Sequence, residues 1–176
     1  MLLMIGLISC GPGTTQSSDT AHTFQIHIGL WTGEFPGYTV ESSWQPLIEW
    51  YEEGASLVIE TEDIDHYDWG QQEIFLTEDA AAEYDAIHRS SMATFSWPAF
   101  VATVDGEPIY GGIFLFRGSA MGIDYPVIYA EPRGEHTAFV IRSTHLLPGN
   151  LPPNEEWGAV ADPRIKLIMS EAGKLE

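Results

Sequence analysis

Residues 100–110 read Phe-Val-Ala-Thr-Val-Asp-Gly-Glu-Pro-Ile-Tyr, the strongest local structural signal in the chain. An Asp-Gly pair between two runs rich in β-branched and aromatic residues is typical of a two-residue hairpin turn. We therefore predict strands over 100–104 and 107–110, joined by a turn at Asp105 and Gly106. Turns that contain Gly and Pro separate the apolar runs that follow. Further strands are predicted over 113–116, 126–130 and 137–143.

The first half of the chain mixes strands with helices. Apolar side chains alternate with others from Phe24 to Trp31, which predicts a half-buried strand with Trp31 on its polar face. Asp162-Pro163 is a helix cap followed by proline at the first helical position. Other helices are predicted over 44–53 and from Thr77 to about Arg89, and other strands over 57–59 and 74–76. The expected fold is α+β, a single antiparallel or mixed sheet of about six strands with two or three packed helices.

Length and composition suit one ordinary domain. The chain has 176 residues, and its 44% hydrophobic content argues against disorder despite the high charge. A run rich in Gly, Ser and Thr follows residue 10 and resembles a flexible tether. We expect a signal peptide over 1–9, a lipid-anchored tether over 10–22 and a single globular α+β domain over 23–176.

The net charge of −19 is concentrated in one half of the chain. Residues 1–88 contain 16 acidic side chains and no Lys or Arg, whereas residues 89–176 contain ten acidic and seven basic side chains. Phosphate backbones attract proteins through Lys and Arg, so nucleic acid is excluded as a partner. Such acidity is also typical of proteins from saline habitats, where it serves solubility instead of a partner.

The N-terminal residues carry a family resemblance. An uncharged apolar run ends in Leu7-Ile8-Ser9-Cys10, which resembles a bacterial lipobox, and the run is too short to span a bilayer. A basic region normally opens such a signal, and an upstream start codon would account for its absence here. The resemblance implies that Cys10 is acylated, becomes the first residue and anchors the protein to a membrane of the cell envelope. With Gly11 after the cysteine, a Gram-negative host would place it in the outer membrane, facing the periplasm.

The acidic stretch from Glu60 to Asp68 is the candidate metal site. Asp63, Asp65 and Asp68 could supply carboxylate oxygens to Ca²⁺, the one cofactor that the sequence suggests. The spacing does not match an EF-hand, however, and a solvated loop of mutually repelling charges is the favoured interpretation.

His66 lies within the same stretch and is the candidate catalytic residue. With a neighbouring aspartate it could act as a general base, and a divalent metal could assist it. The alternative function is therefore a lipid-anchored hydrolase that uses His66 and nearby Asp residues.

Aromatic residues also gather in the acidic half, and Trp31, Tyr67 and Trp69 are the candidate binding residues. Aromatic rings beside carboxylates can stack on sugars, bind cationic groups or form a protein-binding patch. The favoured function is a non-catalytic, lipid-anchored accessory or binding protein with an acidic, aromatic face. Its ligand, a protein, a glycan or a cation, stays open.

Overall fold

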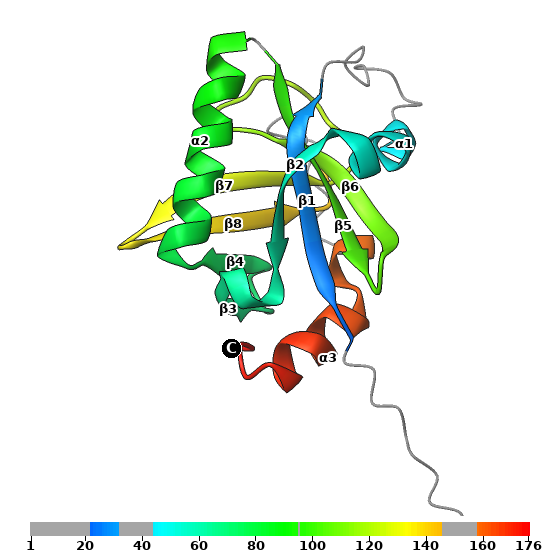
Figure 1. Cartoon of the computed structure of the whole chain (residues 1–176), viewed down its shortest axis with the longest axis vertical. Coiled ribbons are helices and arrows are strands. Elements are labelled where there is room, and N and C mark those ends of the chain that lie inside the picture. Colours follow the sequence, from blue (N-terminus) through cyan, green and yellow to red (C-terminus); the bar gives the residue numbers. More distant parts are fainter. Residues whose placement is uncertain (1–21, 32–43, 95, 146–157) are drawn as a thin grey trace, which may run out of the picture.

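One eight-stranded mixed sheet forms the centre of the described chain (Figure 1). The computed structural model describes residues 22–31, 44–94, 96–145 and 158–176. The strands are β1 (Phe24–Trp31), β2 (Ala55–Glu60), β3 (Ile64–Asp68), β4 (Glu73–Leu76), β5 (Trp97–Val104), β6 (Glu107–Phe114), β7 (Val127–Arg133) and β8 (His136–Arg142). The helices are α1 (Gln45–Gly54), α2 (Glu78–Thr94) and α3 (Pro163–Glu171).

The strand order is β2-β1-β5-β6-β7-β8-β4-β3, and the pair β6–β7 is parallel whereas the other neighbouring pairs are antiparallel. The α+β class with a single sheet is confirmed, but about six strands was too few. The edge strands β2 and β3 are joined by a single 3₁₀ turn, Thr61–Asp63, so they must approach each other at one end. The sheet therefore curves, and α2 packs in its concave side against β1, β2, β5 and β8.

The predicted hairpin is confirmed, with eight residues in each strand. Asp105 and Gly106 both have positive φ, 53° and 77°, as a type I′ turn requires. The Asp105 carboxylate also accepts a hydrogen bond from the Thr23 backbone N–H at 2.9 Å, which ties the turn to the start of β1.

The strand predicted over 107–110 continues to Phe114 as β6, so it includes the start of the separate strand predicted over 113–116. Gly111 and Gly112 suggested a turn, but they lie within β6. A Cβ atom at Gly112 would come within 1.7 Å of the Pro126 carbonyl oxygen. Glycine is therefore needed here for the close approach of the chain that enters β7.

The acidic stretch is not the predicted loop. It forms the 3₁₀ turn and the edge strand β3, whose register with β4 shifts between Ile64 and His66. This bulge buries both Ile64 and Tyr67, three residues apart, and so hides the alternation on which the prediction depended. Beyond β3, the chain near Leu175 pairs with Tyr67 and covers this edge of the sheet.

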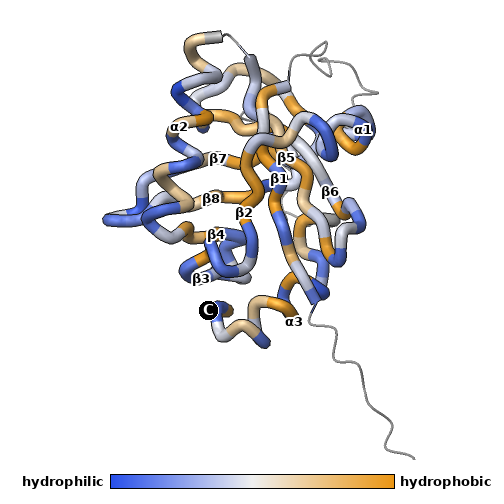
Figure 2. Tube along the Cα trace, in the orientation of Figure 1, coloured by the Kyte–Doolittle hydropathy of each residue, from blue (hydrophilic) through white to orange (hydrophobic). Residues whose placement is uncertain are grey.

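Both faces of the sheet are covered. On the face toward α2 and α3, Tyr84 of α2 packs between Phe114 and Phe139, with ring centroids 5.0 and 4.9 Å away. On the other face, Leu47 and Tyr51 of α1 pack on a second buried cluster. Figure 2 shows the resulting hydrophobic colour along the central strands.

The helices form near their predicted positions, but α2 is longer than predicted. It continues past Arg89 to Thr94, because the cationic side chain favours a helix end without enforcing one. The extra turn carries Ser91 and Met92 beyond the predicted end. In α3, the predicted cap is confirmed: the Asp162 side chain accepts a hydrogen bond from the Arg164 backbone N–H at 2.9 Å.

Candidate binding groove

The structure does not bring the three candidate metal ligands together. Asp63 accepts a hydrogen bond from the Glu60 backbone N–H at 2.9 Å, and Asp68 accepts one from the Gln71 backbone N–H at 2.9 Å. Asp65 instead pairs with the neighbouring imidazole. Among the described residues, no group of three or more His, Cys, Asp or Glu side chains could hold a metal ion.

His66 does meet a carboxylate, as the hydrolase hypothesis requires. Its Nδ1 atom lies 2.9 Å from Asp65 Oδ2, and this hydrogen bond lowers the pKa of the Asp65 carboxyl. Its Nε2 atom lies 3.8 Å from Glu176 Oε2, and its ring stacks on Phe75 at a centroid distance of 4.0 Å. The pair lies on an outer surface of β3, and His66 lines neither of the two cavities described below.

The three candidate aromatic residues do not form one face. Tyr67 is fully buried on the α2 side of the sheet, whereas Trp31 packs on the opposite side. Trp31 was expected to be exposed, but α1 covers that side and its Trp50 meets Trp31 edge to face at 6.0 Å. Trp69 is half-buried, with Lys166 Nζ 5.4 Å from its ring centroid.

A cavity of about 570 Å³ lies between residues 84–92 of α2 and the ends of β5, β6 and β7. We call it the α2 groove. Its buried floor includes Tyr84 and Phe114, which are 3% and 5% exposed. Met92, Trp97 and Phe116 line it too and are 69%, 36% and 69% exposed. Large exposed apolar side chains gathered in one hollow mark a binding surface.

The charged groups of the groove are acidic. Asp85 and Glu131 line it together with His88, and the described residues of its lining include no Lys or Arg. Glu131 forms ion pairs with Arg117 and, at 3.0 Å, with Arg133, which lies outside the lining. Asp85 has no ion-pair partner in the part of the chain that the structure describes.

Comparison of the chain with protein-family models, with curated proteins and with solved structures finds no match. Function must therefore be inferred from the chemistry of the groove itself. Sequence reasoning missed the groove because its residues come from several elements and share no spacing. A usable signal was the presence of bulky apolar residues at or just outside predicted elements, such as Phe116 at the end of the strand predicted over 113–116 and Trp97 before the strand predicted over 100–104.

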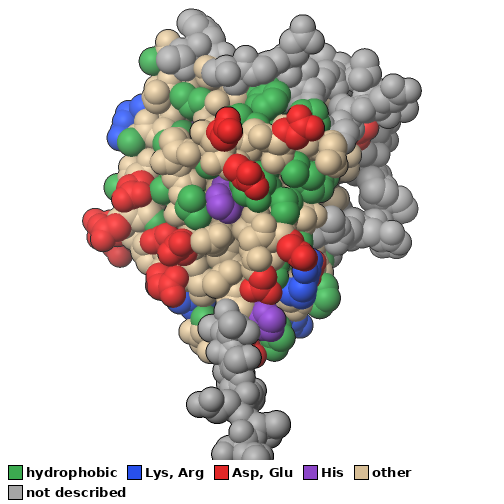
Figure 3. Space-filling view, turned by 45° about the vertical axis from the view of Figure 1, so that its right-hand side comes forward, with side chains coloured by type: hydrophobic (Ala, Val, Ile, Leu, Met, Phe, Trp, Pro, Cys, Tyr) green, Lys and Arg blue, Asp and Glu red, His purple; other side chains and the backbone are tan. Residues whose placement is uncertain are grey.

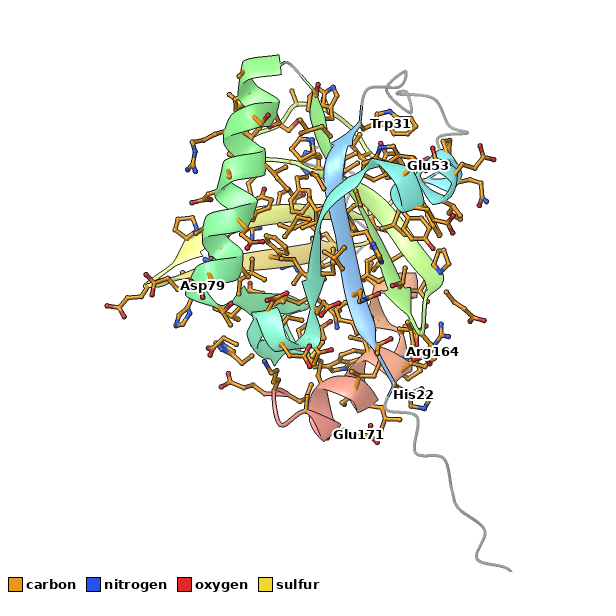
Figure 4. All side chains as sticks on the ribbon, in the orientation of Figure 1. His22, Trp31, Glu53, Asp79, Arg164 and Glu171 are labelled. Carbon is orange, nitrogen blue, oxygen red and sulfur yellow. The ribbon has the colours of Figure 1, made fainter. Side chains whose placement is uncertain are left out.

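A second cavity, of about 420 Å³, lies at the start of β1. Most of its lining residues are polar, and they include Glu60, Glu62, Glu171 and His22. His22 contacts Asp105 at 2.8 Å, and this hydrogen bond raises the pKa of the imidazole. Figure 4 places His22 and Glu171 together at the end of β1 that is opposite to Trp31.

A buried histidine on the α1 side of the sheet has a structural role. The His145 Nε2 atom lies 3.0 Å from the Ser119 carbonyl oxygen, so Nε2 carries the proton that is donated. Nδ1 then accepts the hydrogen bond from the Tyr129 hydroxyl at 2.5 Å. Both ring nitrogens are occupied in holding the segment after β8 against β7.

The predicted acylation site, Cys10, and the predicted tether up to residue 21 lie outside the described residues. The lipobox-like signal therefore stays a prediction. None of the helices in the described ranges is both long and apolar enough to cross a bilayer.

Proposed function

We propose that this protein is a lipid-anchored, non-catalytic binding protein of the cell envelope that holds its ligand in the α2 groove. The observation that carries the proposal is the gathering of Met92, Trp97 and Phe116, all substantially exposed, around one cavity. A volume of about 570 Å³ falls in the range of about 300–1,000 Å³ that small-molecule sites occupy. Burying one such side chain against a ligand stabilises a complex by about 1.5–3 kcal/mol.

The position of the groove is compatible with anchoring at Cys10. Trp97 pairs with Trp31 at the end of β1, whereas the predicted tether precedes its start at Phe24. A strand of eight residues separates these two points by about 23 Å. The anchor and the ligand would therefore occupy opposite ends of the sheet, and neither would obstruct the other.

Nile red, a neutral dye that fluoresces in apolar surroundings, tests the groove. The protein would be the full chain with Cys10→Ala, compared with versions that also carry Met92→Glu or Phe116→Glu. Both positions are 69% exposed, so the changes should not disturb the core. We expect saturable binding of one dye per chain and a loss of affinity of about tenfold in each groove variant.

Leu167→Glu is the matched control. Leu167 is 50% exposed but lies on α3, outside the groove. Its variant should bind the dye as the parent does. Equal binding by the parent and both groove variants, or no binding by any of them, would contradict the proposal.

The anchor is tested separately by fractionation and by labelling with a radioactive fatty acid. The unmodified chain should label and sediment with membranes, and Cys10→Ala should abolish both. Retention of the Cys10→Ala variant in the membrane fraction would refute the lipobox interpretation without bearing on the groove.

A further inference from the structure

The available charge inside the α2 groove is negative. Of its two carboxylates, Glu131 is already compensated by Arg117 and Arg133, whereas Asp85 has no ion-pair partner among the described residues. Asp85 follows Tyr84 on α2 and lies one turn before His88, so it borders the apolar floor directly. A ligand seated on that floor would bring its polar end within reach of this carboxylate.

Aromatic rings surround the same space. Tyr84 and Phe114 form the floor with their centroids 5.0 Å apart, and Trp97 and Phe116 form the exposed wall. The faces of aromatic rings attract cations, Trp most strongly, and sites for ammonium groups commonly combine several rings. Aromatic rings beside a carboxylate that has no ion-pair partner among the described residues form a suitable environment for an organic cation.

The charge of the whole chain favours the same sign of ligand. The net charge is −19, and Figure 3 shows Asp and Glu side chains spread over one face of the molecule, with few Lys or Arg. Such a field concentrates cations and repels anions over about a Debye length, roughly 8–10 Å at ordinary salt. A fatty acid or another anionic lipid would meet Asp85 unfavourably, and a second copy of the chain would bring another 19 negative charges.

We infer that the α2 groove binds a small organic cation, an ammonium group carried on an apolar alkyl or aromatic body. The apolar body lies on the floor formed by Tyr84 and Phe114. The cationic group lies at the mouth beside Asp85, and the exposed rings of Trp97 and Phe116 line the same cavity. This inference rests on the proposed function, because it names the ligand class of the same groove.

Three ligands with one common chain test the inference: octyltrimethylammonium, octanol and octanoate. Each would displace Nile red from the full chain carrying Cys10→Ala. We expect the cation to bind about tenfold more tightly than octanoate, with octanol between them. Lowering the ionic strength from about 0.15 M to about 0.01 M should widen the difference, because the Debye length grows to about 30 Å.

Asp85→Asn is the decisive variant. It should lower the affinity for octyltrimethylammonium about two- to fivefold and leave the affinity for octanol unchanged. Asp79→Asn makes the same chemical change in the first turn of α2 (Figure 4), outside residues 84–92, which line the groove. It should leave all three affinities unchanged, which controls for the loss of one net charge.

The outcomes separate the two proposals. Equal binding of the three ligands, tightest binding of octanoate, or no effect of Asp85→Asn would overturn the cation inference while the groove stays a binding site. Failure of Nile red itself would remove the proposed function and the inference together. A dimer in sedimentation velocity that Phe116→Glu abolishes would assign the groove to a second copy of the chain and overturn both.

Discussion

Replacement of Tyr110 by Phe is expected to stabilise the protein, and the same replacement at Tyr67 to destabilise it. Both side chains are completely buried. The Tyr67 hydroxyl donates a hydrogen bond to Gln72 Oε1 at 2.6 Å, whereas the Tyr110 hydroxyl has no hydrogen-bond partner among the described residues. One oxygen atom is removed in each variant, so the difference between the two isolates the effect of the hydrogen bond.

The magnitudes follow from the cost of burying polar groups. A buried hydroxyl without a partner costs about 1–3 kcal/mol of desolvation. Removing the hydroxyl recovers that free energy, minus the cost of the small void that remains. We expect Tyr110→Phe to raise the free energy of unfolding by about 1 kcal/mol. Tyr67→Phe loses a net hydrogen bond and leaves the buried Gln72 oxygen unpaired, so it should lower that free energy by about 2 kcal/mol.

Urea denaturation of the full chain with Cys10→Ala, followed by far-ultraviolet circular dichroism, measures both changes. The denaturant slope should be the same in the parent and in both variants, because the surface exposed on unfolding does not change. Destabilisation by Tyr110→Phe at an unchanged slope would mean that its hydroxyl is hydrogen-bonded, for example to a buried water.

Three further outcomes are expected. Gly112→Ala should lower the free energy of unfolding by about 1–3 kcal/mol or more, because its Cβ would collide with the Pro126 backbone. Gly122→Ala is the control and should be tolerated, because a Cβ there would have no neighbouring atom within 4 Å. Burial raises the pKa of Tyr125 to about 12 and raises those of the other deeply buried tyrosines. Their stabilising contribution is complete below about pH 10 and falls as the pH rises above it, because the unfolded chain then releases protons that the folded chain retains. The phenolate absorbance of these four tyrosines should therefore rise only together with loss of circular dichroism, and titration of all seven tyrosines near pH 10 without unfolding would disprove this. Asp162→Ala should cost about 1 kcal/mol in urea denaturation through loss of the α3 cap, and an unchanged midpoint would show that the cap is dispensable.

The parts of the fold that were predictable are those that local chemistry determines. The turn at Asp105 and Gly106 requires two residues with positive φ, and the Asp-Gly pair predicts this turn without knowledge of any tertiary contact. The cap at Asp162 is equally local. Strand β3 was missed because its bulge places Ile64 and Tyr67 on one face at an odd spacing. No periodicity argument can anticipate such a bulge, because the extra residue shifts the alternation of the strand and depends on the register with the neighbouring strand.

The candidate site was less predictable than the fold. None of the side chains that the sequence suggested for binding, catalysis or metal coordination lines the α2 groove. Trp31 shows why: alternation identified its side of the strand correctly, but whether that side is exposed depends on α1, which packs there. Met92 entered the groove only because α2 continues a turn further than its charges suggested. Exposure is a tertiary property, and a hollow formed by several elements has no counterpart in a linear pattern.

The charge asymmetry of the sequence survives folding, and the proposed preference of the groove for a cation depends on it. Among the described residues, the ion pairs of Arg117 and Arg164 join them to acids of their own half of the chain. Lys174 is directed to backbone carbonyls, and Arg133 reaches the acidic half only at Glu73. Among the described residues, folding therefore leaves most carboxylates of the acidic half without an ion pair to Lys or Arg. A saline habitat would account for that surface but not for a carboxylate that borders an aromatic groove. The variants Asp85→Asn and Asp79→Asn distinguish solubility from recognition. If the charges serve solubility alone, the two variants should have the same effect on binding, whereas a charge that recognises the ligand should matter only at Asp85.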